Sequence, residues 1–179
     1  MNDTTVIRTS RIELTPLTVS QLRKYLDREE MFIKGVGPVS REILTPNLRK
    51  AIQMKLLKLD KVSLEDSAWI TYWIIKVPPE GFGAGMIGFK GLPDRNGEVE
   101  IGYGIDSAYQ NKGYVTEAVQ EMIRWAFVDS RCRRIIAPNT PRENLASNRV
   151  LEKVGMFIYA ETQDTLSWCI DKGNRALDI

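Results

Sequence analysis

The segment that most restricts the fold is a strand-like stretch that leads into the strongest amphipathic helix of the chain. Residues 98–105 read EVEIGYGI, and this alternation of apolar residues with other residues is typical of a β-strand. Apolar residues recur at helical spacing over 115–126, and a second strand-like stretch follows at 134–137. A strand, a helix and a strand in this order predict at least one pair of parallel strands.

The rest of the pattern places more strands and helices around this unit. We expect further strands at 11–17, 68–77, 86–89, 156–160 and 166–170, and further helices that begin at Thr18 and Thr45 or extend over 144–154. Neither an internal repeat nor a long linker divides the chain, so we expect a single domain over residues 1–179. These elements predict a mixed α/β sheet.

The chain contains no histidine among its 179 residues. This absence excludes triads that use histidine, zinc sites built on imidazole and proton transfer by imidazole. The two cysteines, Cys132 and Cys169, cannot supply a four-sulfur zinc site, so we expect no metal. A net charge of +2 does not favour nucleic acid as a partner. Arg131, Arg133 and Arg134 leave a nucleic-acid interface open as a minor alternative, although such a group is usually a solvated edge.

The ends of the chain and its apolar runs bear on where the protein works. Residues 1–4 are polar, and the longest apolar run is too short to span a membrane. The cysteines form no closely spaced motif. We therefore expect a cytoplasmic protein with free thiols that does not bind a membrane.

One glycine-rich segment imitates a nucleotide-binding motif. Residues 83–88 read GAGMIG and match the dinucleotide-binding fingerprint as a string. That fingerprint binds pyrophosphate only where a strand ends and a helix begins. A strand-like segment follows here, so we interpret these glycines as a hairpin turn.

A better candidate for a phosphate site is the hexapeptide QNKGYV at 110–115, which follows the strand 98–105 and opens the helix. The free backbone N–H groups and the positive end of the helix dipole at such a position suit a phosphate. Gly113 lets the backbone approach a ligand, and Lys112 adds a positive charge. On these six residues alone, an ordinary loop is the simpler interpretation.

The strand before this loop carries two carboxylates on one face. Glu98 and Glu100 share that face with Gly102 and Gly104, where no side chain covers the backbone. A proton acceptor beside open backbone is a candidate reaction site, since glycine inside a strand often marks close approach of a ligand. The alternative is a solvated strand face, which is the commoner setting for a glutamate.

Asn144 stands at the start of the helix predicted over 144–154, and its side chain is suited to cap that helix. A functional interpretation adds a second role, in which the side-chain amide also donates a hydrogen bond to a bound cofactor.

Together, three segments in register resemble the GNAT superfamily of acetyl-CoA-dependent N-acetyltransferases, and most closely its branch of ribosomal-protein N-acetyltransferases. The segments are 98–105, 109–118 (YQNKGYVTEA) and 144–156 (NLASNRVLEKVGM). The resemblance extends from about Gly85 to Phe157. It implies an α/β (α+β) fold with a single mixed, splayed central sheet of about six to seven strands and helices on both faces.

The resemblance also implies where the cofactor, acetyl-CoA, binds. Its pantetheine arm would lie in the splay beside the backbone of Gly104, Ile105 and Asp106. Asn144 would contact this arm, and Ser147 would also belong to the cofactor-binding residues. The pyrophosphate would bind the backbone amides of Gln110, Asn111, Lys112, Gly113, Tyr114 and Val115. In this family a free amine attacks the thioester directly, so the amine must lose a proton and the thiolate must be stabilised or protonated.

Four residues depart from the family's pattern. Val115 stands where the loop usually ends in glycine or alanine, and Asn111 where glycine is common. Leu151 occupies the position at which many members carry a tyrosine general acid, so Ser147 is the candidate proton donor. Met156 replaces a phenylalanine, which we interpret as a change in packing.

By this resemblance we expect an N-acetyltransferase that moves an acetyl group from acetyl-CoA to a primary amine, either a protein N-terminus or a small molecule. Glu100 or Glu98 would be the base, directly or through water, and Ser147 the acid. The alternative, supported by the departures at the loop and at the tyrosine position, is a protein of the same fold that binds CoA as a sensor or partner-binding module without transfer. Residues 17–59 and the last hairpin would shape the acceptor site, and no motif there identifies the acceptor.

Overall fold

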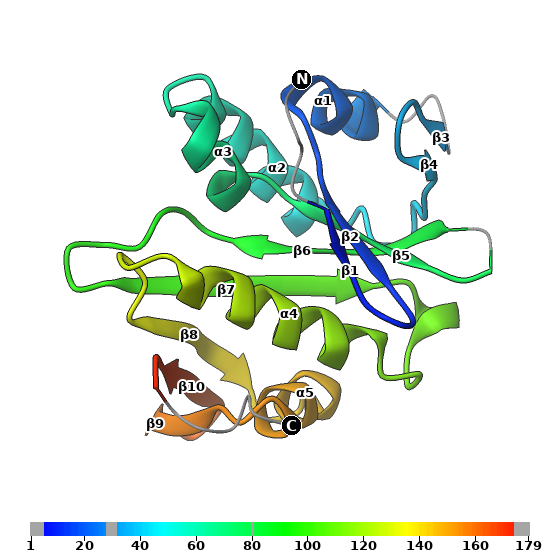
Figure 1. Cartoon of the computed structure of the whole chain (residues 1–179). Helices are drawn as coiled ribbons and strands as arrows, with labels where there is room; N and C mark the ends of the chain where they lie inside the picture. The colour runs from blue at the N-terminus through cyan, green and yellow to red at the C-terminus, as the bar shows by residue number, and fades with distance from the viewer. Residues whose placement is uncertain (1–5, 28–31, 80, 174–179) are drawn as a thin grey trace.

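One eight-stranded sheet runs through the protein, with the strand order β1-β2-β5-β6-β7-β8-β10-β9 (Figure 1). The computed structural model describes residues 6–27, 32–79 and 81–173, so the polar start at 1–4 lies outside the described residues. The strands of this sheet are β1 (Ile7–Arg8), β2 (Glu13–Pro16), β5 (Trp73–Val77), β6 (Phe82–Phe89), β7 (Glu98–Ile105), β8 (Arg134–Pro141), β9 (Phe157–Glu161) and β10 (Thr165–Asp171). A separate pair consists of β3 (Phe32–Ile33) and β4 (Gly37–Pro38). The helices are α1 (Val19–Asp27), α2 (Pro46–Leu59), α3 (Leu64–Ile70), α4 (Tyr114–Val128) and α5 (Leu145–Lys153), with a 3-10 turn, η1, at Ser107–Tyr109.

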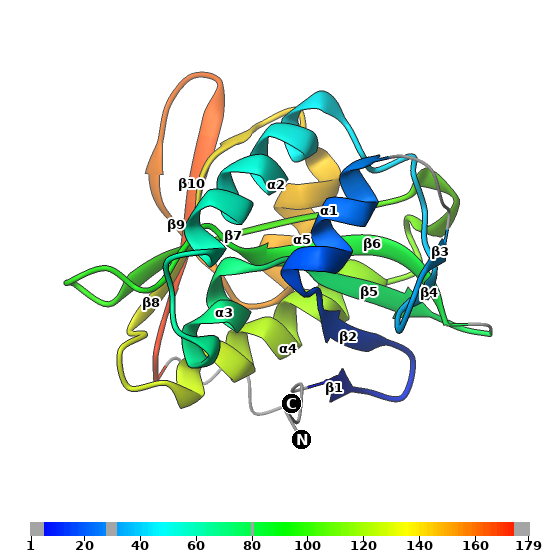
Figure 2. The ribbon, with the colours of Figure 1, turned by 90° about the horizontal axis from the view of Figure 1, so that it is seen from above.

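Helices cover both faces of the sheet (Figures 1 and 2). The buried side chains of α1 and α2 pack with Ile74 and Met86, whereas those of α4 pack with Trp73 and Ile87. Because successive residues of a strand point to opposite faces, the apolar residues of β5 and β6 serve both layers. Leu151 of α5 joins the same buried cluster as α4.

Polar caps begin the first two helices, as the sequence predicts. Thr18 N–H donates to Gln21 Oε1 at 2.9 Å, and Gln21 N–H donates to Thr18 Oγ1 at 3.3 Å, which together form a capping box. Leu48 N–H donates to Thr45 Oγ1 at 3.2 Å. Pro46 is the first residue of α2, where its missing N–H costs no helical hydrogen bond.

β7 and β8 run parallel but separate after a short pairing. They pair only over Glu98–Glu100 and Arg134–Ile136, although β7 continues to Ile105 and β8 to Pro141. On its other side, β7 stays paired with β6 as far as Ile105. The sheet therefore opens between β7 and β8, and the start of α4 lies at the same end of β7.

The strand expected at 68–77 is wrong in its first part. Residues 64–70 form α3, and β5 begins only at Trp73. Ser63 caps this helix, since its Oγ accepts a hydrogen bond from Asp66 N–H at 3.2 Å. A short apolar run cannot by itself distinguish a buried strand from the end of a buried helix, and the cap at Ser63 was the signal that could have done so.

The glycines of 83–88 lie inside β6 and not in a hairpin turn, which corrects a second expectation. A Cβ at Gly85 would lie 2.6 Å from the Gly104 carbonyl oxygen, and a Cβ at Gly88 would lie 2.8 Å from the Thr71 carbonyl oxygen. Close approach of neighbouring backbones therefore requires glycine at both positions. The segment continues as a strand, so it lacks the helix start that a dinucleotide site needs.

The sheet has eight strands rather than the expected six to seven, and the short β1 adds one edge. Within the part of the chain that the structure describes, no helix has both the length and the apolar character needed to cross a lipid bilayer.

Candidate active site

Two residues with left-handed backbone conformation turn the chain from η1 into α4. Asn111 has a φ of 60°, and Gly113, the N-cap of α4, has a φ of 82°. Glycine adopts this conformation without strain, and asparagine adopts it more readily than most other residues. Asn111 thus meets the same conformational demand as a glycine. Gly113 has no side chain to cap the first turn of α4, so those N–H groups are available to an anion.

A cavity of about 600 Å³ is bounded by the end of β7, the loop before α4 and the first turns of α4 and α5. Nine of the eleven predicted cofactor-binding residues line it, namely Gly104, Ile105, Gln110, Asn111, Gly113, Tyr114, Val115, Asn144 and Ser147. Tyr103, Arg149 and Lys153, which the sequence did not single out, line it as well. The two cations of α5 add positive charge opposite the helix start, which suits a ligand with phosphate groups.

The other two predicted residues, Asp106 and Lys112, are not among the lining residues. The Asp106 carboxylate accepts hydrogen bonds from Ser40 Oγ at 2.5 Å and from Ala108 N–H at 2.9 Å, and the bond from Ser40 lowers the pKa of this carboxyl. Asp106 N–H donates to the Ala84 carbonyl at 2.8 Å. The Lys112 ammonium lies 5.2 Å from the centre of the Tyr109 ring.

The backbone of β7 presents unpaired groups to the open side of the sheet. Lys90 N–H donates to the Glu100 carbonyl at 2.9 Å, so the even-numbered residues of β7 bond to the β6 side. Backbone groups of successive residues alternate between the two sides of a strand. The N–H and C=O groups of Tyr103 and Ile105 therefore point toward the gap that β8 leaves, where an extended ligand can pair with them.

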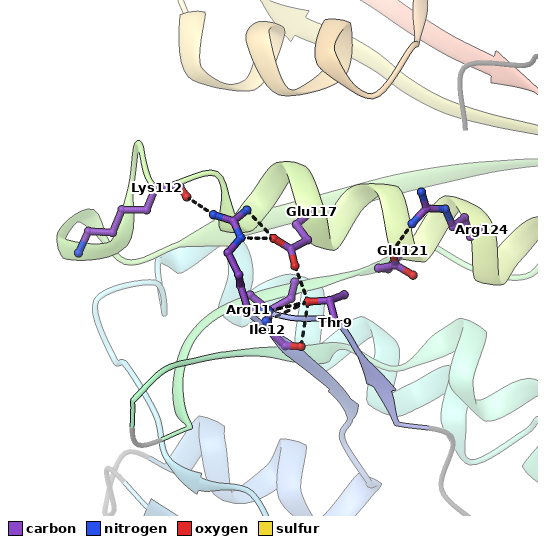
Figure 3. Close-up of polar contacts among 7 residues, drawn as sticks. All are labelled: Thr9, Arg11, Ile12, Lys112, Glu117, Glu121 and Arg124. Carbon is purple, nitrogen blue, oxygen red and sulfur yellow. Dashed lines mark hydrogen bonds and ion pairs between the residues drawn. The ribbon is translucent and has the colours of Figure 1, made fainter. Parts of the chain in front are cut away.

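A hairpin near the N-terminus supports the loop from outside the cavity (Figure 3). Arg11 Nη1 donates to the Lys112 carbonyl at 3.1 Å, and Arg11 Nε donates to Glu117 Oε2 at 2.7 Å. Sequence reasoning missed Arg11, because it lies 106 residues before Glu117 and no motif connects the two.

Ser147 shares a hydrogen bond with a tyrosine from another element. The Tyr103 hydroxyl lies 2.9 Å from Ser147 Oγ, and burial raises the pKa of Tyr103 to about 12. The phenol therefore stays protonated at neutral pH and remains able to donate. Leu151, at the position where the family pattern has its tyrosine, is fully buried in the core. The phenol that bonds Ser147 in this cavity comes from β7 and not from α5.

Asn144 caps α5, as predicted. Its Oδ1 accepts a hydrogen bond from Ser147 N–H at 3.1 Å. Within the described part of the chain, Nδ2 of Asn144 has no hydrogen-bond acceptor, and Asn144 lines the cavity. The geometry is compatible with both roles that the sequence allows.

Glu98 and Glu100 lie on β7, and neither is among the residues that line the cavity. Glu100 forms an ion pair with Lys90, and its side chain is 25% exposed. Glu98 pairs with Arg134 in the parallel ladder, at the end of β7 away from the phosphate loop. Between Glu100 and that loop, a Cβ at Gly102 or Gly104 would meet no atom within 4 Å, so this face of β7 is open.

Comparison with known proteins identifies the family, because residues 11–157 match the family model described as "Acetyltransferase (GNAT) domain". The chain belongs to this GNAT family. A curated relative, the uncharacterized N-acetyltransferase YjdG of Bacillus subtilis, is 35% identical over 96 residues, which cover 54% of this chain and 56% of that protein. The chain thus matches about half the length of that relative.

Solved GNAT structures share the whole architecture. RimL, the ribosomal L7/L12 alpha-N-protein acetyltransferase, superimposes with a TM-score of 0.67 at 17% identity, covering 94% of this chain and 98% of that chain. RimL in complex with coenzyme A gives a TM-score of 0.65 at 16% identity, covering 93% and 98%. At these identities the likeness shows the fold.

Proposed function

We propose that this GNAT protein transfers an acetyl group from acetyl-CoA to a primary amine, either a protein N-terminus or a small molecule. The observation that carries the proposal is the cavity between the end of β7 and α5, which reaches the uncapped start of α4. This cavity offers backbone hydrogen-bonding groups along one wall and an anion site at one end, which an extended thioester with a pyrophosphate requires.

The residues of the cavity fit acetyl-CoA. The N–H groups at Gly113, Tyr114 and Val115 would bind the pyrophosphate, and the backbone of Tyr103 and Ile105 would pair with the pantetheine arm. The Asn144 amide and the cations of α5 would add polar contacts along the arm and at the phosphates. The bound group supplies an activated acetyl thioester.

The chain's own groups then move the protons. Glu100 or Glu98 would take the proton of the amine, directly or through water, on the open face of β7. The Ser147 hydroxyl, bonded to the Tyr103 phenol, would donate a proton to the leaving sulfur. Ser147 is thus the proposed acid, and the glutamates are the proposed bases.

A second candidate function is binding of CoA without transfer, as a sensor or partner-binding module. The ion pair between Glu100 and Lys90 favours it, because this contact engages the proposed base. The burial of Leu151 at the tyrosine position favours it as well.

Release of free thiol from acetyl-CoA separates the two functions. We expect thiol release that depends on the amine across a panel of peptides with free N-termini and small primary amines. Replacing Glu98 and Glu100 together by glutamine should lower turnover about 100-fold and change its pH profile. Glu121→Gln, on α4, is the matched control. If CoA binds but no amine accelerates thiol release, the second function is the correct one.

The cytoplasm is the proposed location. Both cysteines, Cys132 and Cys169, are buried as free thiols, which is typical of a reducing compartment.

A further inference from the structure

The side chain of Arg11, in the hairpin of β1 and β2, contacts the phosphate loop (Figure 3). Its Nη1 donates to the Lys112 carbonyl at 3.1 Å, and that carbonyl lies between the two left-handed residues, Asn111 and Gly113. Its guanidinium carbon lies 5.6 Å from the centre of the Tyr114 ring. Arg11 therefore contacts the loop on both sides of the helix start.

The guanidinium of Arg11 leaves little room for a side chain at Gly113. A Cβ at Gly113 would lie 3.3 Å from Arg11 Nη2, which is tighter than ordinary contact, and the φ of 82° is itself unfavourable for other residues. The guanidinium thus packs directly against the N-cap residue of α4.

The same guanidinium neutralises a carboxylate in the first turn of α4. Glu117 belongs to that turn, and its Oε2 lies 2.7 Å from Arg11 Nε and 2.5 Å from Arg11 Nη2. The hydroxyl of Thr9 donates to the other oxygen, Oε1. The Glu117 side chain is 15% exposed, so water screens its charge only in part.

This pairing matters for a phosphate ligand. An unpaired carboxylate in the first turn of α4 would repel a pyrophosphate bound at the same helix start. Arg11 is not among the residues that line the cavity and lines a separate hollow of about 390 Å³ instead. Any effect of Arg11 on a bound phosphate would therefore pass through the loop and through Glu117, and not through direct contact.

We infer that Arg11 is a positioning residue for the phosphates of CoA: it fixes the loop at Lys112 and Gly113 and cancels the charge of Glu117. The inference rests on the proposed binding of CoA at the start of α4. It assigns a role in cofactor binding to the β1–β2 hairpin, which lies outside the cavity.

Calorimetric titration with CoA tests this role without any acceptor amine. Arg11→Ala should weaken CoA binding at least about tenfold, because a charge-assisted hydrogen bond to the loop is lost and the Glu117 carboxylate loses its ion pair with Arg11. Glu117→Gln should bind CoA within about twofold of the wild type, since Arg11 still holds the loop. The double variant should bind CoA more tightly than Arg11→Ala alone. The penalty of Arg11→Ala should shrink as salt is raised.

The controls separate positioning from a general loss of structure. Arg124→Ala and Glu121→Gln alter an ion pair further along α4, and both should bind CoA as the wild type does. S-acetylpantetheine, which has no phosphate, should bind Arg11→Ala and wild type equally in ligand-observed NMR. Thermal unfolding checks that each variant is folded. If Arg11→Ala does not fold, Arg11→Lys takes its place in the test. Arg11→Lys keeps the charge but loses the planar fork, so it should bind CoA with an affinity between those expected for the wild type and Arg11→Ala.

Two kinds of failure are distinguishable. If the wild type itself does not bind CoA, the proposed function is wrong. If the wild type binds CoA and Arg11→Ala binds it equally well, the role of Arg11 is refuted. A loss in Glu117→Gln as large as that in Arg11→Ala, or a parallel loss of S-acetylpantetheine binding, would also overturn it, because either result indicates a structural ion pair only.

Discussion

At the scale of single residues, the proposed acid Ser147 is bonded to Tyr103, and the two side chains come from different elements. A serine hydroxyl is a poor acid by itself, whereas a hydrogen-bonded pair of hydroxyls can pass a proton along and recover it. Burial raises the pKa of Tyr103 to about 12, so the phenol stays protonated at neutral pH and can donate within this pair.

Tyr103→Phe removes only the hydroxyl of this pair. We expect kcat for acetyl transfer to the best amine of the panel to fall about tenfold, with KM for acetyl-CoA within about twofold of the wild type. Steady-state thiol release measures both values. Tyr109→Phe is the matched control, because Tyr109 lines the same cavity and its hydroxyl has no bond to Ser147. An unchanged kcat in Tyr103→Phe would show that the hydroxyl pair takes no part in proton transfer.

Residues that are neighbours in the sequence could be recognised as a site, whereas contacts between distant residues could not be predicted. The phosphate loop is continuous in sequence, so its glycine, its position before a helix and its neighbours could be recognised together. Tyr103 reaches Ser147 across 44 residues, and Arg11 reaches Glu117 across 106. A single sequence carries no local signal for such contacts, because only the sheet and the packed helices bring the partners together.

At the scale of elements, β7 alternates over 8 residues and α4 keeps its helical spacing over most of its 15 residues. Both elements were predicted correctly. The strand expected at 68–77 failed at its start because only Thr71 interrupts the apolar residues that run from the end of α3 into β5. The glycines of β6 were interpreted wrongly because the requirement for glycine comes from a neighbouring strand. A Cβ at Gly85 would collide with the backbone of Gly104, and no local pattern in the sequence reveals that contact.

Gly85 and Gly104 lie on the neighbouring strands β6 and β7, one register position apart, and provide a matched test of what each glycine is for. Gly85→Ala should cost about 1–3 kcal/mol in the free energy of unfolding, because its Cβ would lie 2.6 Å from a backbone oxygen that cannot move aside. Gly104→Ala should leave that free energy unchanged or raise it by about 0.5–1 kcal/mol, since nothing lies within 4 Å of its Cβ.

Gly104→Ala should also weaken CoA binding several-fold, because Gly104 lines the cavity and the proposed ligand would lie close to that backbone. Urea unfolding measures the effect on stability, and CoA titration measures the effect on binding. A stable Gly104→Ala protein with unchanged CoA affinity would show that the strand is left open for some reason other than close approach of the cofactor.

At the scale of the whole molecule, one buried lysine joins three parts of the fold. Lys55 of α2 is 5% exposed. Its ammonium donates to the Ile70 carbonyl at the end of α3, at 2.7 Å, and to the Phe89 carbonyl at the end of β6. It also lies 4.5 Å from the centre of the Tyr72 ring. The contact fixes α2 against the sheet on the face that carries Glu100.

Burial, together with the like charges of Lys58 and Lys90, lowers the pKa of Lys55 to about 7. The group therefore has a lower pKa in the folded protein than in the unfolded chain, where the ordinary value of about 10.4 applies. Below about pH 7 both states carry the proton, and the folded state bears the full cost of the buried charge. Between these two pKa values the unfolded chain binds a proton that the folded protein does not, so the free energy of unfolding rises with pH.

Lys55→Met keeps the length of the side chain and removes its titration. The difference in free energy of unfolding between wild type and Lys55→Met should rise from pH 7 to pH 10 in favour of the wild type, with a slope of up to about 1.4 kcal/mol per pH unit. Urea unfolding in a series of buffers measures it, with Lys50→Met, on the exposed side of the same helix, as the control for loss of one lysine. A difference that stays constant over this range would mean that Lys55 keeps its proton in the fold, held by the two carbonyls and the Tyr72 ring.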